Sequence, residues 1–247
     1  PWGRIMHLLK KVDELIYSHI QETRKNFDEN RKDILSLMMT ARYDNGQAMT
    51  DEELRDELVT LLVIGHETTA SSLVWALSWI DQLPKVQEKL QTELCQNSFE
   101  PSQLAKLPYL TAVCQETLRI YPVLTTCTSR VVKSPLNVMG YELPAKTLII
   151  PNIYLTHHRE EVYPNPKQFI PERFLERQFS PYEYLPFGGG NRQCIGMAFA
   201  MYEMKIILGT ILSQYQILSL IRRPIKPARR GLTIVVPPKM QMQATPR

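Results

Sequence analysis

The residues best suited to chemistry lie in one short stretch, 187–196, which reads Phe-Gly-Gly-Gly-Asn-Arg-Gln-Cys-Ile-Gly. Its three consecutive glycines allow the backbone to lie flat against a large planar ligand, because no Cβ atom keeps that ligand away. Cys194 precedes a helix-prone run, 197–212, whose first N–H groups would favour a thiolate over a thiol. Arg192 is placed to meet an anionic group beside the same face. The stretch therefore predicts a thiolate ligand for a haem iron.

A second polar pattern interrupts the most apolar long run of the chain, residues 58–79. Gly-His-Glu-Thr-Thr at 65–69 places polar side chains at the centre of this run. They form either a satisfied polar patch, since a threonine can bond back to the preceding helical turn, or an acid–alcohol pair over a reaction centre. Because the cysteine loop lies in the same chain, we favour Glu67 and Thr68 as that catalytic pair. Polar groups here are costly in lipid, so the run predicts a helix buried in protein.

A third pattern pairs charges on a helix that we expect over residues 109–120. Glu116 and Arg119 are three residues apart and therefore neighbours on one helix face. Arg173, in the Pro-Glu-Arg-Phe sequence at 171–174, could join them in a buried network. Such a network fixes geometry more than it raises stability.

The helices and strands that must position these residues are predicted from apolar periodicity, capping residues and prolines. Apolar residues at a three–four spacing predict helices over residues 5–25, 34–38, 51–81, 85–95, 109–120 and 197–212. Thr50 and Glu53 form a capping box at the start of the longest helix. Frequent prolines from 121 to 186 exclude long helices there, and short strands are expected at 130–132, 136–139 and 147–150. Residues 214–220 and 232–236 are expected to form a closing hairpin.

The length of residues 1–247 allows one sizeable core or one large domain, and the expected elements make it mainly α with small β-sheets. The net charge of +4 is too weak to indicate nucleic-acid binding. The basic cluster of Arg222, Arg223, Lys226, Arg229 and Arg230 is interpreted as a solvated surface rather than a docking site. Four cysteines without a Cys-x-x-Cys pair argue against a zinc site or disulfide framework and suit a cytoplasmic location. No signal peptide opens the chain and nothing requires membrane contact, although an anchor preceding Pro1 stays open.

Together the four motifs, at 65–69, 116–119, 171–174 and 187–196, resemble those of the carboxyl-terminal half of a cytochrome P450. The resemblance implies the long central helix, the Glu-x-x-Arg helix, the meander and the cysteine loop of that fold. It also implies haem b with iron bound to Cys194, whose electron density favours O–O cleavage. Glu67 and Thr68 would then hold dioxygen and relay protons. The remaining haem contacts that it implies are Phe187, Gly188, Gly190, Arg192, Gly196 and Arg130. It also matches residues 123–126 and 231–233 to segments that line the substrate pocket of the family.

The implied activity is a monooxygenase that hydroxylates an apolar molecule such as a fatty acid, alkane or terpenoid, as in bacterial, cyanobacterial-type members. It would need dioxygen and a separate redox donor, a ferredoxin or a reductase. The alternatives are a non-catalytic haem-binding fragment and the family's isomerases or dehydratases, which tend to lack the acid–alcohol pair. Ile64 departs from the small residue usual before Gly65 and could crowd the oxygen site. Family members are nearly twice this long, so the isolated chain is expected to be incomplete and to bind haem weakly.

Overall fold

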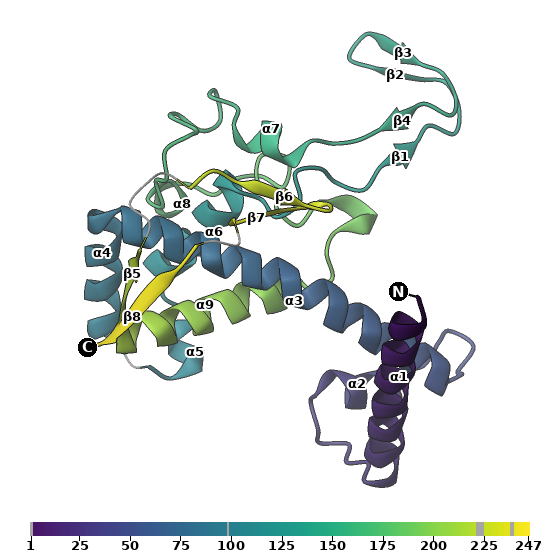
Figure 1. Ribbon diagram of the computed structural model, residues 1–247. Helices are drawn as coiled ribbons and strands as arrows, with labels where there is room; N and C mark the ends of the chain where they lie inside the picture. Colours follow the sequence, from purple (N-terminus) through teal and green to yellow (C-terminus); the bar gives the residue numbers. More distant parts are fainter. Residues whose placement is uncertain (1, 98, 221–224, 238–239) are drawn as a thin grey trace. The chain divides into compact units, whose positions relative to one another are not determined.

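The computed structural model describes residues 2–97, 99–220, 225–237 and 240–247. Helices and small two-stranded antiparallel sheets make up these residues (Figure 1), which confirms the predicted mainly α class. The chain divides into two compact units, Pro1–His66 and Glu67–Arg247. The expectation of one partial domain stays a prediction. Of the basic cluster predicted as a solvated surface, Arg222 and Arg223 lie outside the described residues, whereas Lys226, Arg229 and Arg230 are exposed.

The first unit contains α1 (Trp2–Lys25), α2 (Ile34–Thr40) and the beginning of α3 (Asp51–Gln82). Its small core consists of buried apolar side chains from these helices, namely Ile20, Leu35, Met39 and Leu54. The predicted capping box is confirmed at the start of α3, where the Thr50 N–H donates to Glu53 Oε2 over 2.7 Å and the Glu53 N–H donates to Thr50 Oγ1 over 3.2 Å. The Thr50 N–H and hydroxyl both donate to Glu53 Oε2, and these two bonds lower the pKa of the Glu53 carboxyl.

The predicted burial of α3 is wrong for its centre. Leu62, Val63 and Ile64 are 65%, 67% and 58% exposed, whereas Trp75 and Ile80 are buried. A helix that is apolar all round is buried only where each of its faces has a partner. Among the described residues, the two ends of α3 have such partners, Leu54 in the core of the first unit and Ala76 and Ile80 in the core of the second. By length and composition alone α3 could cross a membrane, which for a single helix is weak evidence.

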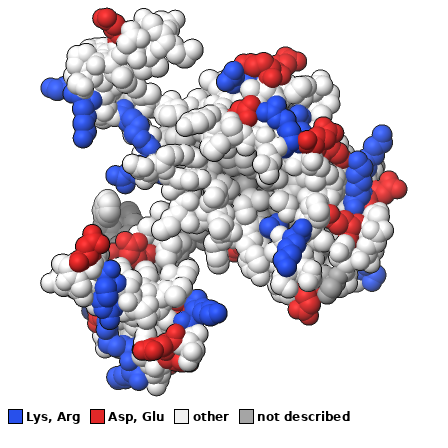
Figure 2. Space-filling model, turned by 180° about the vertical axis from the view of Figure 1, so that it is seen from behind, with Lys and Arg blue, Asp and Glu red and all other residues white. Residues whose placement is uncertain are grey.

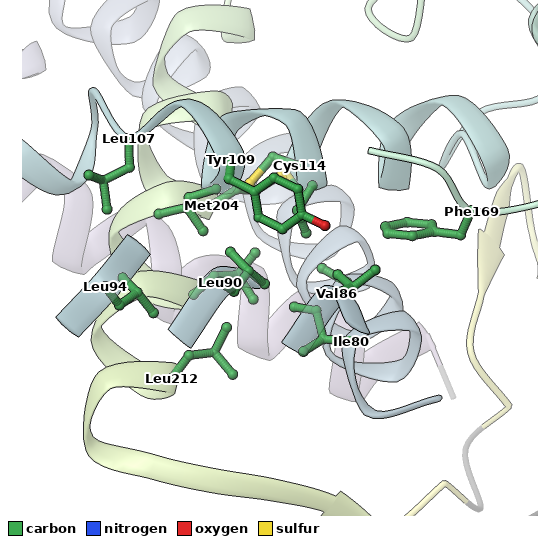
Figure 3. Close-up of a cluster of buried hydrophobic side chains, with 14 of the residues drawn as sticks. Ile80, Val86, Leu90, Leu94, Leu107, Tyr109, Cys114, Phe169, Met204 and Leu212 are labelled. Atoms are coloured by element: carbon green, nitrogen blue, oxygen red, sulfur yellow. The ribbon is translucent and has the colours of Figure 1, made fainter. Parts of the chain in front are cut away.

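The second unit is built on α4 (Pro84–Cys95), α5 (Pro101–Leu104), α6 (Pro108–Ile120) and α9 (Met197–Gln214). Proline stands at the start of α4, α5 and α6, where its missing N–H breaks no helical bond and its fixed φ suits the first turn. Their apolar faces meet in one core (Figure 3), where Leu90 and Leu94 of α4 lie beside Met204 and Leu212 of α9. This core holds α9, which follows the cysteine loop, against α4 and α6.

Four two-stranded sheets complete the described part of the second unit. Strands β1 (Arg130–Val131) and β4 (Leu148–Ile149) pair, as do β2 (Leu136–Val138) and β3 (Tyr141–Leu143). Met139 and Gly140, both with positive φ, make the tight turn between β2 and β3.

The predicted closing hairpin between residues 214–220 and 232–236 is wrong. Strand β5 (Tyr215–Ser219) pairs instead with β8 (Met242–Pro246), and β7 (Thr233–Val235) pairs with β6 (Ala228–Arg230). Both predicted strands exist, but each takes a partner that the local pattern did not indicate. Strand pairing depends on residues distant in sequence, whereas alternation indicates only that a strand forms.

Candidate haem-thiolate site

The cysteine loop is closed by backbone hydrogen bonds. The Cys194 N–H donates to the Phe187 carbonyl over 2.9 Å, and the Gly188 N–H donates to the Leu185 carbonyl over 2.9 Å. Gly188 and Gly190 have φ of +71° and +65°, a left-handed conformation that side chains with a Cβ rarely adopt. Glycine is therefore required at these two positions for the loop to close around Cys194.

The four cysteines occupy different environments. Burial raises the pKa of the Cys114 thiol to about 12, and burial also raises the pKa of Cys127. Cys95 and Cys194 are exposed, but Cys95 is the last residue of α4, at the negative end of the helix dipole. Cys194 instead stands two residues before Gly196, the N-cap of the 18-residue α9 helix, where partial positive charge gathers. Cys194 is thus the cysteine best placed to present an anionic sulfur.

The glycine backbone beside this sulfur is open. A Cβ atom added to Gly189 or Gly190 would meet no atom within 4 Å, and one on Gly196 would lie 3.8 Å from the Cys194 sulfur. The described residues contain no cluster of three or more His, Cys, Asp or Glu side chains that could hold a metal ion. A single soft ligand beside bare backbone therefore fits a metal already held in a macrocycle, as in haem.

Other residues predicted to contact haem lie around this loop or on β1. Arg192 is exposed at the end of the short helix η1 (Gly190–Arg192). Arg130 is exposed on β1, and its Nη1 donates to the carbonyls of Thr128 and Ser129 over 2.7 and 3.3 Å. Phe187 is partly buried against the helical core. Pairing of the two arginines with propionates, and shielding of the sulfur by Phe187, stay predictions.

Glu67 of the predicted acid–alcohol pair contacts the β6–β7 hairpin. The Thr233 hydroxyl donates to Glu67 Oε1 over 3.3 Å, and Arg230 Nε lies 3.7 Å from the same oxygen. Sequence reasoning missed both partners, since neither lies near Glu67 in the chain. The neighbouring Thr68 is half-buried, and its carbonyl accepts a bond from the Ser72 hydroxyl over 2.9 Å.

The same hairpin pairs with the segment that follows α6. Leu124 forms a β-bridge with Thr233, and the Ile234 N–H donates to the Val123 carbonyl over 2.8 Å. The resemblance matched residues 123–126 and 231–233 to segments that line a substrate pocket. The structure brings these two segments together and places Glu67 against one of them.

The predicted charge network forms inside the second unit. Both carboxylate oxygens of Glu116 accept bonds from Arg119, from Nε over 2.6 Å and from Nη2 over 2.8 Å. Arg173 Nε and the Ile170 N–H both donate to Glu116 Oε1, over 3.2 and 2.8 Å. Glu116 and Arg119 have no exposed surface, and Arg173 is 8% exposed. The three charged residues are therefore brought together as expected.

Arg119 extends this network into the meander, residues that follow β4 and precede the cysteine loop. Its Nη1 donates to the carbonyl of His157 over 2.8 Å, and its Nη2 donates to that of Gln168 over 3.2 Å. His157 ends α7 (Ile153–His157), and Arg173 begins α8 (Arg173–Glu176). Sequence reasoning found neither the two short helices nor His157. The pattern Thr-His-His-Arg at 156–159 carried no distinguishing signal.

The chain matches known proteins along nearly its whole length. The profile of the cytochrome P450 family matches residues 1–243. Cytochrome P450 135B1 of Mycobacterium tuberculosis is 40% identical over 218 residues, which are 87% of this chain and 45% of that protein. Cytochrome P450 137 of the same organism is 33% identical over 226 residues, 91% of this chain and 46% of that protein. The crystal structure of a cytochrome P450, CYP102L1, superposes with a TM-score of 0.87 at 28% identity, over 99% of this chain and 58% of that one.

A cysteine loop before a long helix, in one unit with a buried Glu–Arg–Arg network, is the arrangement expected of a haem-thiolate protein. This chain belongs to the cytochrome P450 family, in which the haem iron is bound by a cysteine. Its fold is a partial cytochrome P450 fold. The chain spans about half the length of the curated relatives that it matches.

Proposed function

We propose that the protein carrying this chain is a monooxygenase that hydroxylates an apolar small molecule, such as a fatty acid, alkane or terpenoid. The observation that carries this proposal is the exposed Cys194 sulfur, which stands before α9 and beside an open glycine surface. Family membership supports the general reaction. The substrate class rests on the resemblance and on the apolar residues described below.

Haem b would be held by Cys194 as a ligand of its iron, together with the backbone of Gly188, Gly190 and Gly196. Arg192 and Arg130 are both exposed and would supply positive charge for its carboxylates. When bound, the haem would supply the activation of dioxygen that side chains of a protein cannot provide.

The chain's own contribution to the reaction would be the delivery of protons. The Glu67 side chain is 42% exposed, so its carboxyl can exchange protons with solvent. The Thr233 hydroxyl lies 3.3 Å from Glu67 Oε1 and 2.8 Å from the Arg230 carbonyl oxygen, so its single proton can be donated to either acceptor. The Thr68 hydroxyl, on the next residue of α3, would pass those protons onward through water, as a general acid does.

An apolar substrate suits the segments that meet at the β6–β7 hairpin. Leu124 and Leu232 are 41% and 79% exposed within the chain, and each belongs to or adjoins one of these segments. Exposed apolar side chains at such a site favour a ligand that buries them. The polar contacts of Glu67 lie on the same hairpin, so apolar binding and proton delivery would be adjacent.

Electrons would come from a separate donor, a ferredoxin or a reductase, and we place the protein in the cytoplasm. An isomerase or dehydratase of the same family would need no external electrons, and a non-catalytic haem-binding protein would form no product. Product formation in the complete protein, measured with and without dioxygen and reductant, distinguishes the three. The proposal requires that product depend on both. Product formed without reductant would contradict it.

The first prediction concerns the Thr68 hydroxyl. In the complete protein, Thr68→Ala should lower the product formed per reductant consumed and slow product formation by about 100-fold or more, because general acid catalysis contributes about 10²–10⁴-fold. Thr68→Ser, which keeps a hydroxyl, is the matched control and should retain most of the coupling. Equal coupling in the parent and in Thr68→Ala would show that the hydroxyl relays no proton.

A further inference from the structure

His157 is a fully buried imidazole that the proposed reaction does not use. Its Nδ1 lies 3.1 Å from the Arg119 carbonyl oxygen, and its Nε2 accepts a hydrogen bond of 2.9 Å from the Leu185 N–H. In return, Arg119 Nη1 donates to the His157 carbonyl over 2.8 Å. The ring therefore joins the carboxyl-terminal end of α6 to the segment that enters the cysteine loop.

These partners assign the tautomer of the ring. A backbone N–H can only donate, so Nε2 must carry the lone pair that accepts from Leu185. The proton of the neutral imidazole is then on Nδ1, which donates to the carbonyl of Arg119. A second proton would place an N–H at Nε2 facing the N–H of Leu185, and the hydrogen bond between Leu185 and His157 would be lost.

The surroundings of the ring keep it neutral. Burial is the largest cause that lowers the pKa of His157, to about 3, and the charges of Arg119 and His158 act in the same direction. Tyr184 stacks on the ring at 5.5 Å between centroids, and Tyr163 meets it edge-on at 6.3 Å. Glu116, the buried carboxylate of this region, is engaged by Arg119 and Arg173.

Leu185 is linked to the Cys194 sulfur through a few covalent and hydrogen bonds. The Leu185 carbonyl accepts from the Gly188 N–H over 2.9 Å, which begins the turn. Two residues after Leu185, the Phe187 carbonyl accepts from the Cys194 N–H over 2.9 Å. A displacement of the Leu185 peptide would therefore be transmitted to both bonds that close the loop.

We propose that His157 is a positioning residue, which as a neutral Nδ1–H imidazole fixes the Leu185 peptide and thereby the place of the Cys194 sulfur. It couples the buried Glu116–Arg119–Arg173 network to the ligand loop, a role that deepens and rests on the proposed haem-thiolate function. The network alone cannot do this, because the contacts of its arginines end at carbonyls of the meander. His157 provides a bond from that network to the loop's own entry segment.

The test compares His157→Phe with His157→Gln in the complete, haem-loaded protein. Phenylalanine keeps the aromatic contact with Tyr184 but removes both hydrogen bonds. Glutamine retains an oxygen that can accept from the Leu185 N–H. His158→Phe is the matched control, because that ring bonds only the carbonyl of Tyr154, within α7, and stacks on the Tyr154 side chain.

Two readouts separate positioning from general stability. Amide hydrogen exchange at Leu185 should accelerate at least about tenfold in His157→Phe, and should return towards the parent rate in His157→Gln. The carbon-monoxide difference spectrum should show loss of the thiolate-ligated form in His157→Phe and its recovery in His157→Gln. His158→Phe should change neither readout.

Parent-like Leu185 protection and thiolate fraction in His157→Phe would overturn the proposal. If His157→Phe fails to fold, His157→Gln is compared with His157→Asn, whose shorter amide reaches the Nδ1 position but not Leu185. Equal Leu185 protection in these two variants would also overturn it. If the parent shows no thiolate spectrum, the proposed function fails, whereas the exchange rate at Leu185 still decides the role of His157.

Discussion

At the scale of single residues, the neutral state of His157 makes a prediction about stability. Its pKa is about 3 in the folded protein and near the ordinary value of 6.5 in the unfolded chain. Between these values the unfolded chain binds a proton that the folded protein does not. The free energy of unfolding contributed by His157 is therefore fully present above pH 6.5 and is lost progressively as the pH falls towards 3.

From pH 7 to pH 5 this loss amounts to about 2 kcal/mol for a single such group. Denaturant unfolding of the parent and of His157→Gln at pH 7, 6 and 5 measures it. Other titrating groups are common to both proteins, so the difference between the two curves isolates His157. We expect the difference to shrink towards acid pH; parallel curves would contradict a buried, neutral imidazole.

The sequence predicts the chemical residues of the site unevenly. The sequence could reveal Cys194, Glu116 and Arg119 because they belong to short motifs with fixed spacing. His157 could not, because its role comes from bonds to backbone groups 38 and 28 residues away. Nearly any residue type can supply a backbone N–H or carbonyl partner, so sequence patterns cannot reveal such a bond.

At the scale of elements, Glu116 holds α6 against the meander. Glu116→Gln should lower the free energy of unfolding by about 3–5 kcal/mol, because Arg119 and Arg173 would remain buried without a compensating charge. Glu161→Gln is the control, since Glu161 forms an exposed ion pair with Arg159 and should leave the denaturation midpoint unchanged. Similar losses in both variants would show that burial of the network is unimportant.

Gly209 makes the second element-scale prediction, since it permits the close approach of α9 to α5. A Cβ at Gly209 would lie 3.1 and 3.3 Å from the two methyl carbons of Leu104, tighter than ordinary contact. Gly209→Val should therefore destabilise the protein by about 1–3 kcal/mol in denaturant unfolding, through overpacking. Gly3→Val in α1, with no atom within 4 Å, is the control. A Gly209→Val variant as stable as its parent would contradict this packing.

Whether a helix could be predicted from the sequence depended mainly on its length. The helices α1, α3, α4, α6 and α9 lie where apolar periodicity predicted them, with ends shifted by a few residues. The helices α5, α7 and α8 were missed, because four or five residues cannot display a helical period. Strands β5 and β7 were found but assigned to each other, since their partners are set by packing elsewhere in the unit.

At the scale of the whole molecule, the chain carries the ligand loop, the charge network and the α3 segment of its family on about half of its relatives' length. The order of the four motifs in the sequence predicted that the chain corresponds to the carboxyl-terminal half of a family member. It failed on the burial of α3, because an apolar helix indicates that partners are needed without showing where they are. Leu62 and Val63 were predicted to be buried, but both are exposed.

Charge is distributed without a dominant sign on the face shown in Figure 2, where Lys and Arg alternate with Asp and Glu. On this face the described residues therefore offer no extended basic surface. A net charge of +4 agrees with such a mixture.

One measurement tests the central claim most directly, the bond between the Cys194 sulfur and a haem iron. The carbon-monoxide difference spectrum of the complete protein is compared with that of Cys194→Ser, with Cys95→Ser as control because Cys95 is also exposed. We predict a thiolate-type band in the parent and in Cys95→Ser, and its loss in Cys194→Ser. A thiolate band that survives Cys194→Ser would contradict the assignment of the ligand and every role built on it.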